Sequence, residues 1–147
     1  MTRMSIKACI EAFSARNAAV AGIYRDGAKG ILSRSVSSLA ASVGDQRREL
    51  GKDLAALEGA VAAPSTELEI EIDAAHFAPP PQEAGGDPAG FLRLVRKIES
   101  EDYELLTAVS GAVLPTSIEV AERLAAFAEQ AHKRSSWAQD HLDLLGI

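Results

Sequence analysis

Glu129 and His132 are the two residues whose type and spacing most clearly suggest chemistry. They stand three residues apart in a stretch, Ser117–Ile147, whose pattern predicts a helix. Residues three apart on a helix point to nearly the same side, and a carboxylate and an imidazole at this spacing can hold a metal inside a helix bundle. One such pair is a weak signal. Glu129 could instead be solvated beside Lys133, and His132 could simply hydrogen-bond a neighbouring carboxylate.

The whole chain has the length and composition of one helical domain. Its 147 residues suit a single domain spanning 1–147, and a chain of this size can bury about two-thirds of its unfolded surface. Hydrophobic residues make up 47%, and aromatic residues only 5%. Alanine is abundant, which favours closely packed helices over strands.

Charge and cysteine content exclude several classes of protein. The net charge is −6 and the basic residues are scattered, so the sequence lacks the electropositive footprint of a nucleic-acid binder. No stretch approaches the roughly 20 apolar residues that a membrane span needs. The single cysteine, Cys9, cannot form an intramolecular disulfide and is expected to be a small buried apolar residue. We therefore expect a cytoplasmic protein that binds neither nucleic acid nor membrane.

The first half of the chain predicts two amphipathic helices. The first spans about 5–26, and the second spans about 31–62 after a turn marked by Gly27 and Gly30. Because this turn is short, the two helices should be antiparallel neighbours. Their expected inner residues are Ile6, Ile10, Phe13, Asn17, Val20, Tyr24, Leu32, Val36, Leu39, Val43, Gln46, Leu50, Leu54, Leu57 and Val61. Arg47, Arg48 and Lys52 are expected on the side of the second helix that faces water.

The segment from about 64 to 86 interrupts the helical pattern. Within it, Thr66–Asp73 alternates between apolar and acidic residues, which is typical of a half-buried strand. A lone strand is only marginally stable. Leu68, Ile70 and Ile72 could face the bundle, or the strand could pair with its copy in a second subunit. The second arrangement favours a homodimer, the commonest closed assembly.

The second half of the chain predicts two more helices. The third begins at Asp87-Pro88, a favoured pair for a helix start, and ends near Gly111. The fourth follows Pro115, where Thr116 and Glu119 form a capping box. The expected inner residues are Phe91, Leu94, Val95, Ile98, Asp102, Leu105, Val109, Ile118, Ala121, Leu124, Ala125, Ala128, His132, Ser135, Gln139 and Leu142. Trp137 should lie on a more exposed flank.

Two short-linked helix pairs joined by one long crossover predict an all-α four-helix bundle in which the second and third helices run parallel. With this topology the chain resembles the ferritin-like superfamily, and within it the small rubrerythrin-type bundles. The resemblance rests also on Tyr24 and Tyr103, at comparable places in the first and third helices, and on the stretch Leu124–His132. It implies a carboxylate from the third helix, matched by Glu99, and a Glu-x-x-His pair from the fourth, matched by Glu129 and His132.

The first half departs from that family's pattern. Asn17 stands where the resemblance implies a glutamate, and Gln46 to Glu49 stand where it implies Glu-x-x-His. Two adjacent divalent cations need anionic bridges. Glu49, Glu99 and Glu129 could offset the charge of one cation but hardly two. The chain is therefore not expected to be a working di-iron enzyme.

Two functions remain open at this stage. The first is a residual site for a single divalent metal, iron, manganese or zinc, held by Glu99, Glu129 and His132, with Glu49 across the bundle as a further contact. The second is a metal-free bundle that binds a protein partner or a small molecule. The first requires the three ligands to converge, whereas the second requires a cavity lined by apolar residues or an exposed apolar patch.

Overall fold

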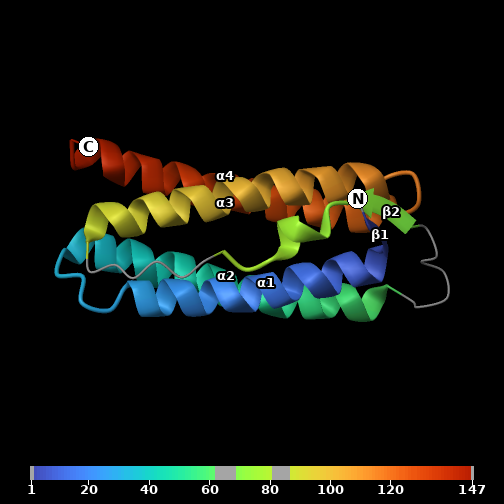
Figure 1. Ribbon diagram of the computed structural model, residues 1–147, viewed down its shortest axis with the longest axis horizontal. Helices are drawn as coiled ribbons and strands as arrows, with labels where there is room; N and C mark the ends of the chain where they lie inside the picture. Colours follow the sequence, from blue (N-terminus) through green and yellow to red (C-terminus); the bar gives the residue numbers. More distant parts are fainter. Residues whose placement is uncertain (1, 62–68, 81–86, 147) are drawn as a thin grey trace.

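The computed structural model describes residues 2–61, 69–80 and 87–146, most of which form four long helices (Figure 1). The helices are α1 Ile6–Gly27, α2 Arg34–Ala60, α3 Pro88–Val113 and α4 Ile118–Leu144. Three short elements accompany them: the strands β1 Thr2–Ser5 and β2 Glu69–Ile72, and the 3₁₀ helix η2 Ala74–Phe77. The expected all-helical architecture is thus confirmed, with a small two-stranded sheet added.

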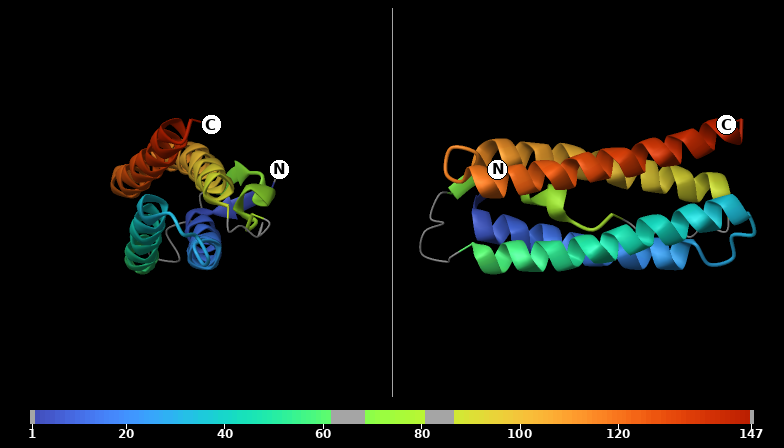
Figure 2. Two further views of the ribbon diagram at one scale, coloured as in Figure 1. Left: turned by 90° about the vertical axis from the view of Figure 1, so that its left-hand side faces the viewer. Right: turned by 180° about the vertical axis from the view of Figure 1, so that it is seen from behind.

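The four helices form two antiparallel pairs. The short turn after Gly27 joins α1 to α2, and another short turn joins α3 to α4 (Figure 1). The helices α2 and α3 run in the same direction, and the described part of the segment between them, residues 69–80, runs back along the bundle (Figure 1). Viewed end-on, the helices occupy four corners, with α1 and α2 on one side and α3 and α4 on the other (Figure 2). Contacts within each pair are far more extensive than contacts between the pairs.

Polar side chains define the helix starts. Ser5, Ser33, Asp87 and Ser117 are N-caps, and each accepts a hydrogen bond from a backbone N–H two or three residues further on. The start at Asp87 is the predicted one. In α4 the cap is Ser117 rather than the predicted Thr116. Because α2 begins only after Ser33, Leu32 lies in the turn and is 96% exposed, so its predicted inward position is wrong.

The strand in the crossover finds a partner that the sequence did not suggest. β2 pairs antiparallel with β1, at the start of the same chain, with Thr2 opposite Ile72 and Ser5 opposite Glu69. Ile72 is buried, as predicted, whereas Leu68 lies outside the described residues. Pairing within the chain supplies backbone hydrogen bonds to β2. This pairing removes part of the reason for predicting a homodimer.

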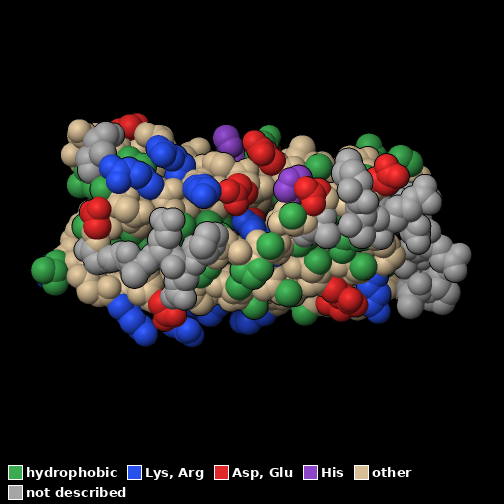
Figure 3. Space-filling model, viewed as in Figure 1, with side chains coloured by type: hydrophobic (Ala, Val, Ile, Leu, Met, Phe, Trp, Pro, Cys, Tyr) green, Lys and Arg blue, Asp and Glu red, His purple; other side chains and the backbone are tan. Residues whose placement is uncertain are grey.

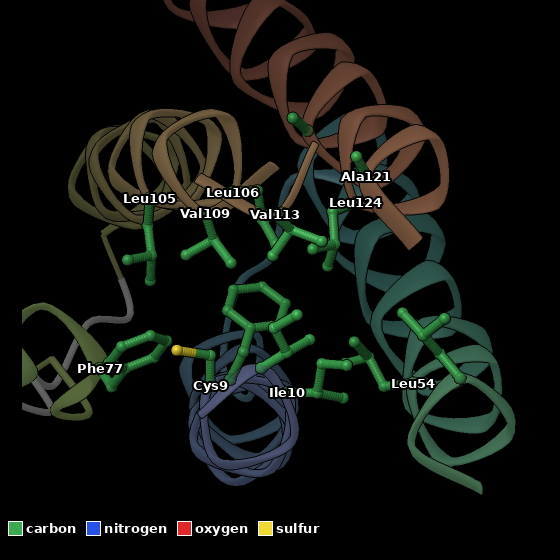
Figure 4. Packing of buried hydrophobic residues seen from close by; sticks show 14 of the residues in the cluster. Cys9, Ile10, Leu54, Phe77, Leu105, Leu106, Val109, Val113, Ala121 and Leu124 are labelled. Carbon is green, nitrogen blue, oxygen red and sulfur yellow. The ribbon is translucent and has the colours of Figure 1, made fainter. Parts of the chain in front are cut away.

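The apolar core is divided into two clusters along the bundle. Figure 4 shows the first cluster, where Cys9 and Ile10 of α1, Leu54 of α2 and Phe77 of η2 pack with side chains of α3 and α4. The second cluster fills the other end; its buried residues include Val20, Tyr24, Val36, Val43, Phe91, Leu92, Val95, Ala138 and Leu142. Phe77 anchors the crossover to the core of the bundle.

The exterior carries both signs of charge. On the face that shows α1, α3 and the crossover, acidic and basic side chains are interspersed (Figure 3). Among the described residues, no helix is long and apolar enough to cross a membrane.

Candidate functional site

A layer of buried charge separates the two apolar clusters. Its members come from all four helices and are at most 3% exposed: Arg16, Asn17, Arg47, Glu99, Asp102 and Arg134. Buried charged residues are rare unless they are paired. This layer of buried polar and charged side chains is therefore the candidate functional site of the described chain.

Glu99 of α3 lies at the centre of the layer. Arg47 of α2 donates through Nη1 to both of its carboxylate oxygens, at 3.1 and 3.2 Å. Arg134 of α4 donates through Nε to Oε1, and Tyr24 of α1 donates its hydroxyl to Oε2 at 3.1 Å. One carboxylate thus connects all four helices. Charge-assisted hydrogen bonds of this kind are about twice as strong as neutral ones.

Asp102 extends the network towards the crossover. It lies one turn after Glu99 on α3, and its oxygens accept hydrogen bonds from Arg47 Nη1 and from Arg16 Nε of α1, the latter at 2.7 Å. Arg16 also donates to the backbone carbonyl of Ala78 at 2.6 Å and to Glu101 at 3.3 Å. The network therefore holds the crossover segment as well as the helices.

The network is not fully satisfied. Among the described residues, four buried side-chain atoms lack a hydrogen-bond partner: Asn17 Oδ1, Arg47 Nε, Arg47 Nη2 and Arg134 Nη2. Asn17 uses its Nδ2 group to donate to the Arg47 carbonyl at 2.9 Å. Three guanidinium nitrogens therefore keep unused donor capacity inside the bundle, which costs free energy unless water or a ligand accepts from them.

The charges in the layer stabilise one another. Burial alone would lower the pKa of Arg47, but the adjacent Glu99 and Asp102 carboxylates more than offset this and raise it. Three buried arginines face two buried carboxylates, and the third carboxylate, Glu101, is 46% exposed. Within the fully buried part of the layer, positive charge is thus in excess.

Tyr24 should make the protein sensitive to alkaline pH. Burial, followed by the Glu99 charge, raises the pKa of its hydroxyl well above 10. Above about pH 10 the unfolded chain therefore releases this proton and the folded chain keeps it, so stability should fall by up to about 1.4 kcal/mol per pH unit for this group. We expect urea unfolding between pH 8 and 11 to show this fall in the wild type and a weaker one in Tyr24→Phe.

Some alkaline loss should remain in Tyr24→Phe because burial raises the pKa of the Cys9 thiol to about 11. Tyr103→Phe is the control, because Tyr103 lies outside the charged layer and is only partly buried. An identical pH dependence in the wild type and Tyr24→Phe would contradict the prediction.

The sequence predicted an inward position for Asp102, and the resemblance implied one for Glu99; both residues are buried. The three buried arginines were not predicted. Arg47 was expected to face water and is instead fully buried. Its position could have been found, because Val43, Arg47, Leu50 and Leu54 follow one another at spacings of four, three and four, a single helical stripe. Arg134 continues the stripe of Ala131 and Ala138 in the same way.

The residues predicted to hold a metal are not brought together. Glu99 is buried, but Glu49, Glu129 and His132 are exposed, so the inward position predicted for His132 is wrong. Glu49 pairs with Lys52 on α2 at 3.1 Å, and the His132 ring lies against Tyr103. In the described ranges, no three side chains of histidine, cysteine, aspartate or glutamate gather in a way that could hold a metal ion.

The chemistry of the buried donors also disagrees with a metal centre. Both Glu99 oxygens already accept from arginine, and Oε2 accepts from Tyr24 as well. The guanidinium groups of Arg47 and Arg134 carry the positive charge that a metal ion would supply, and arginine has no lone pair with which to bind one. The residues present do not fit the predicted single-metal site.

Two hollows flank the charged layer. One, of about 650 Å³, lies between the crossover and α3 and includes Arg16 in its lining. The other, of about 450 Å³, lies between α2 and α4 and includes Arg134. Both volumes fall within the range of small-molecule sites. An arginine of the network thus reaches a surface hollow on each side.

Comparison of the chain with protein-family models, with curated proteins and with solved structures found no match.

Proposed function

We propose that this chain is a metal-free four-helix bundle of ferritin-like topology whose function is to bind a small molecule. One observation carries the proposal: the central carboxylates accept hydrogen bonds from arginines of α1, α2 and α4. Glu99 accepts from Arg47 and Arg134, and Asp102 accepts from Arg47 and Arg16. Cations built into the protein replace the metal ions that such carboxylates would otherwise bind.

The layout of the bundle supports binding rather than catalysis. Contacts between α2 and α4 are sparse, and a hollow opens between them. Arg134 connects this hollow to the charged layer, whereas the other lining residues, apart from the buried Leu50, are partly or fully exposed. A hydrogen-bonded layer beside an accessible hollow can orient a ligand without taking part in a reaction.

The competing function, a single-metal binder, predicts a different response to metal. We expect the purified protein to bind no stoichiometric Fe(II), Mn(II) or Zn(II) under reducing conditions, because the buried carboxylates are already paired with arginine. Isothermal titration and elemental analysis after desalting measure this directly. His132→Ala and Asn17→Ala should match the wild type in both measurements.

A one-to-one metal complex that His132→Ala abolishes would overturn the proposal and favour the single-metal function. Thermal melting adds an independent readout, since a ligand that binds only the native state raises the melting temperature. The melting temperature of the wild type should be the same with each metal as with a chelator.

A further inference from the structure

The hollow between α2 and α4 combines three kinds of recognition group. Its lining is Asp45, Gln46, Glu49, Leu50 and Asp53 from α2, with Ala126, Phe127, Gln130 and Arg134 from α4. It includes a buried guanidinium, three carboxylates on one helix and an apolar wall. Each of these groups restricts the chemistry of an occupant.

The guanidinium belongs to Arg134, whose side chain is 2% exposed. Its Nε donates to Glu99, and its Nη1 donates to the side-chain oxygen of Gln46 at 3.3 Å. Its Nη2 has no partner among the described residues and is covered from solvent, so a ligand reaches it only after a side-chain movement in the lining of the hollow. A buried guanidinium with a free N–H calls for an acceptor oxygen, and a carboxylate is its best geometric match.

The carboxylates belong to Asp45, Glu49 and Asp53, which follow one another at intervals of four residues. This spacing places them on one side of α2, about 6 Å apart along the helix axis. Asp45 pairs with Arg48 and Glu49 pairs with Lys52, but all four side chains are more than half exposed. Exposed pairs of this kind contribute little, so the carboxylates remain able to attract a cation.

The apolar wall consists of Leu50, Ala126 and Phe127. Leu50 is buried and Phe127 is partly buried against the core, so the wall is firmly supported. It borders the same hollow as the α2 carboxylates and the α4 guanidinium, and can accept a branched or aromatic group.

We propose that this hollow binds a free α-amino acid with an apolar side chain. The ligand carboxylate accepts from Arg134, the ammonium group lies among the α2 carboxylates, and the side chain packs on Leu50 and Phe127. A simple anion would be repelled by three carboxylates, and a simple cation would leave Nη2 of Arg134 without an acceptor. A zwitterion satisfies both, and the volume of about 450 Å³ suits a molecule of this size.

This inference rests on the proposed function and narrows it to one ligand class. The test compares L-leucine with two analogues of the same shape by isothermal titration to the full chain in the presence of a chelator. The analogue 4-methylpentanoate lacks the ammonium group, and 3-methylbutan-1-amine lacks the carboxylate. Trp137, the only tryptophan, lies one helical turn beyond Arg134 and offers a second, fluorescent readout.

We expect L-leucine to bind one-to-one with the two analogues at least about tenfold weaker, equivalent to about 1.4 kcal/mol for each lost group. The paired variant Glu49→Gln/Asp53→Asn should weaken leucine binding but leave 4-methylpentanoate unaffected or improved. Glu122→Gln, an exposed glutamate of α4 outside the hollow, is the matched control. Arg134→Lys should weaken leucine and 4-methylpentanoate alike, because it removes the planar guanidinium.

Equal binding of either analogue and leucine would overturn the zwitterion proposal, as would no binding of L-leucine at about 10 mM, a concentration above the Kd of even a weak site. If Arg134→Lys does not fold, the comparison of Glu49→Gln/Asp53→Asn with Glu122→Gln still tests the proposal, because these substitutions lie at the surface. If leucine does not bind and the titrations show no metal binding, the amino-acid proposal is wrong but the proposed metal-free bundle is not contradicted. Stoichiometric metal binding would overturn that function regardless of leucine.

Discussion

Replacing Glu99 by alanine is expected to lower the free energy of unfolding by about 3–5 kcal/mol, the usual cost of removing one partner from a buried ion pair. Glu99 is fully buried and accepts hydrogen bonds from Arg47, Arg134 and Tyr24. Its removal leaves Arg134 without a carboxylate and Arg47 with only Asp102. Since a domain's total stability is about 5–15 kcal/mol, the variant should lose a large part of its stability.

Urea denaturation followed by far-ultraviolet circular dichroism measures this effect. Glu104→Ala is the control, because Glu104 is exposed on the same helix and the two substitutions change helix propensity equally. The control should lose less than about 1 kcal/mol. A loss below about 1 kcal/mol in Glu99→Ala would contradict the central position of this carboxylate.

A compensated variant separates lost pairing from lost packing. Glu99→Leu combined with Arg47→Met and Arg134→Met replaces three charged side chains by apolar ones and leaves Asp102 with Arg16. Buried ionic clusters replaced in this way often keep or gain stability. We expect this triple variant to be more stable than Glu99→Ala. Greater destabilisation would mean that the polar layer is required to specify the bundle.

The second large effect is expected for Arg47→Ala, again about 3–5 kcal/mol. Arg47 is the side chain that contacts both buried carboxylates, through Nη1. Without it, Glu99 and Asp102 stand one turn apart on α3 with one fewer cation between them. The volume left by the long side chain adds a cavity cost. The variant should unfold at a clearly lower urea concentration than the wild type.

The neighbouring arginine supplies the control for this prediction. Arg48 is 58% exposed and pairs with Asp45 at the surface, so Arg48→Ala should cost less than about 1 kcal/mol. The two variants differ by one position along the same helix. Equal effects would show that the buried contacts of Arg47 contribute nothing to stability.

The sequence by itself determined the helical architecture. Apolar residues at spacings of three and four gave the four helices, because such a pattern can be buried only on one side of a helix. The Asp87-Pro88 start, the capping box at Thr116 and the glycine and proline breaks gave most of the boundaries to within a few residues. Asn17 and Asp102 fall within apolar stripes and were predicted to face inward, whereas the inward position of Glu99 came from the family resemblance; all three residues are buried.

The tertiary structure decided which charged side chains are buried and which side chains they pair with. Arg47 and Arg48 are adjacent and chemically identical, but a rotation of about 100° per residue places one in the core and the other in water. A composition-based expectation that arginine is exposed therefore fails at Arg47. The Arg47 guanidinium can be buried because Glu99 and Asp102, on another helix, accept its hydrogen bonds and offset its charge.

The rotation of α4 about its axis determines that the predicted metal ligands Glu129 and His132 are exposed. The sequence allowed a stripe through His132, but the helix packs through Ala128, Ala131 and Arg134. Small alanines permit the close contact between α3 and α4, and this packing turns Glu129 and His132 outward. Likewise, the pairing of β2 with β1 depends on residues far apart in sequence. Periodicity identifies a helix and its apolar side, but the partner of a buried charge is set by contacts between elements.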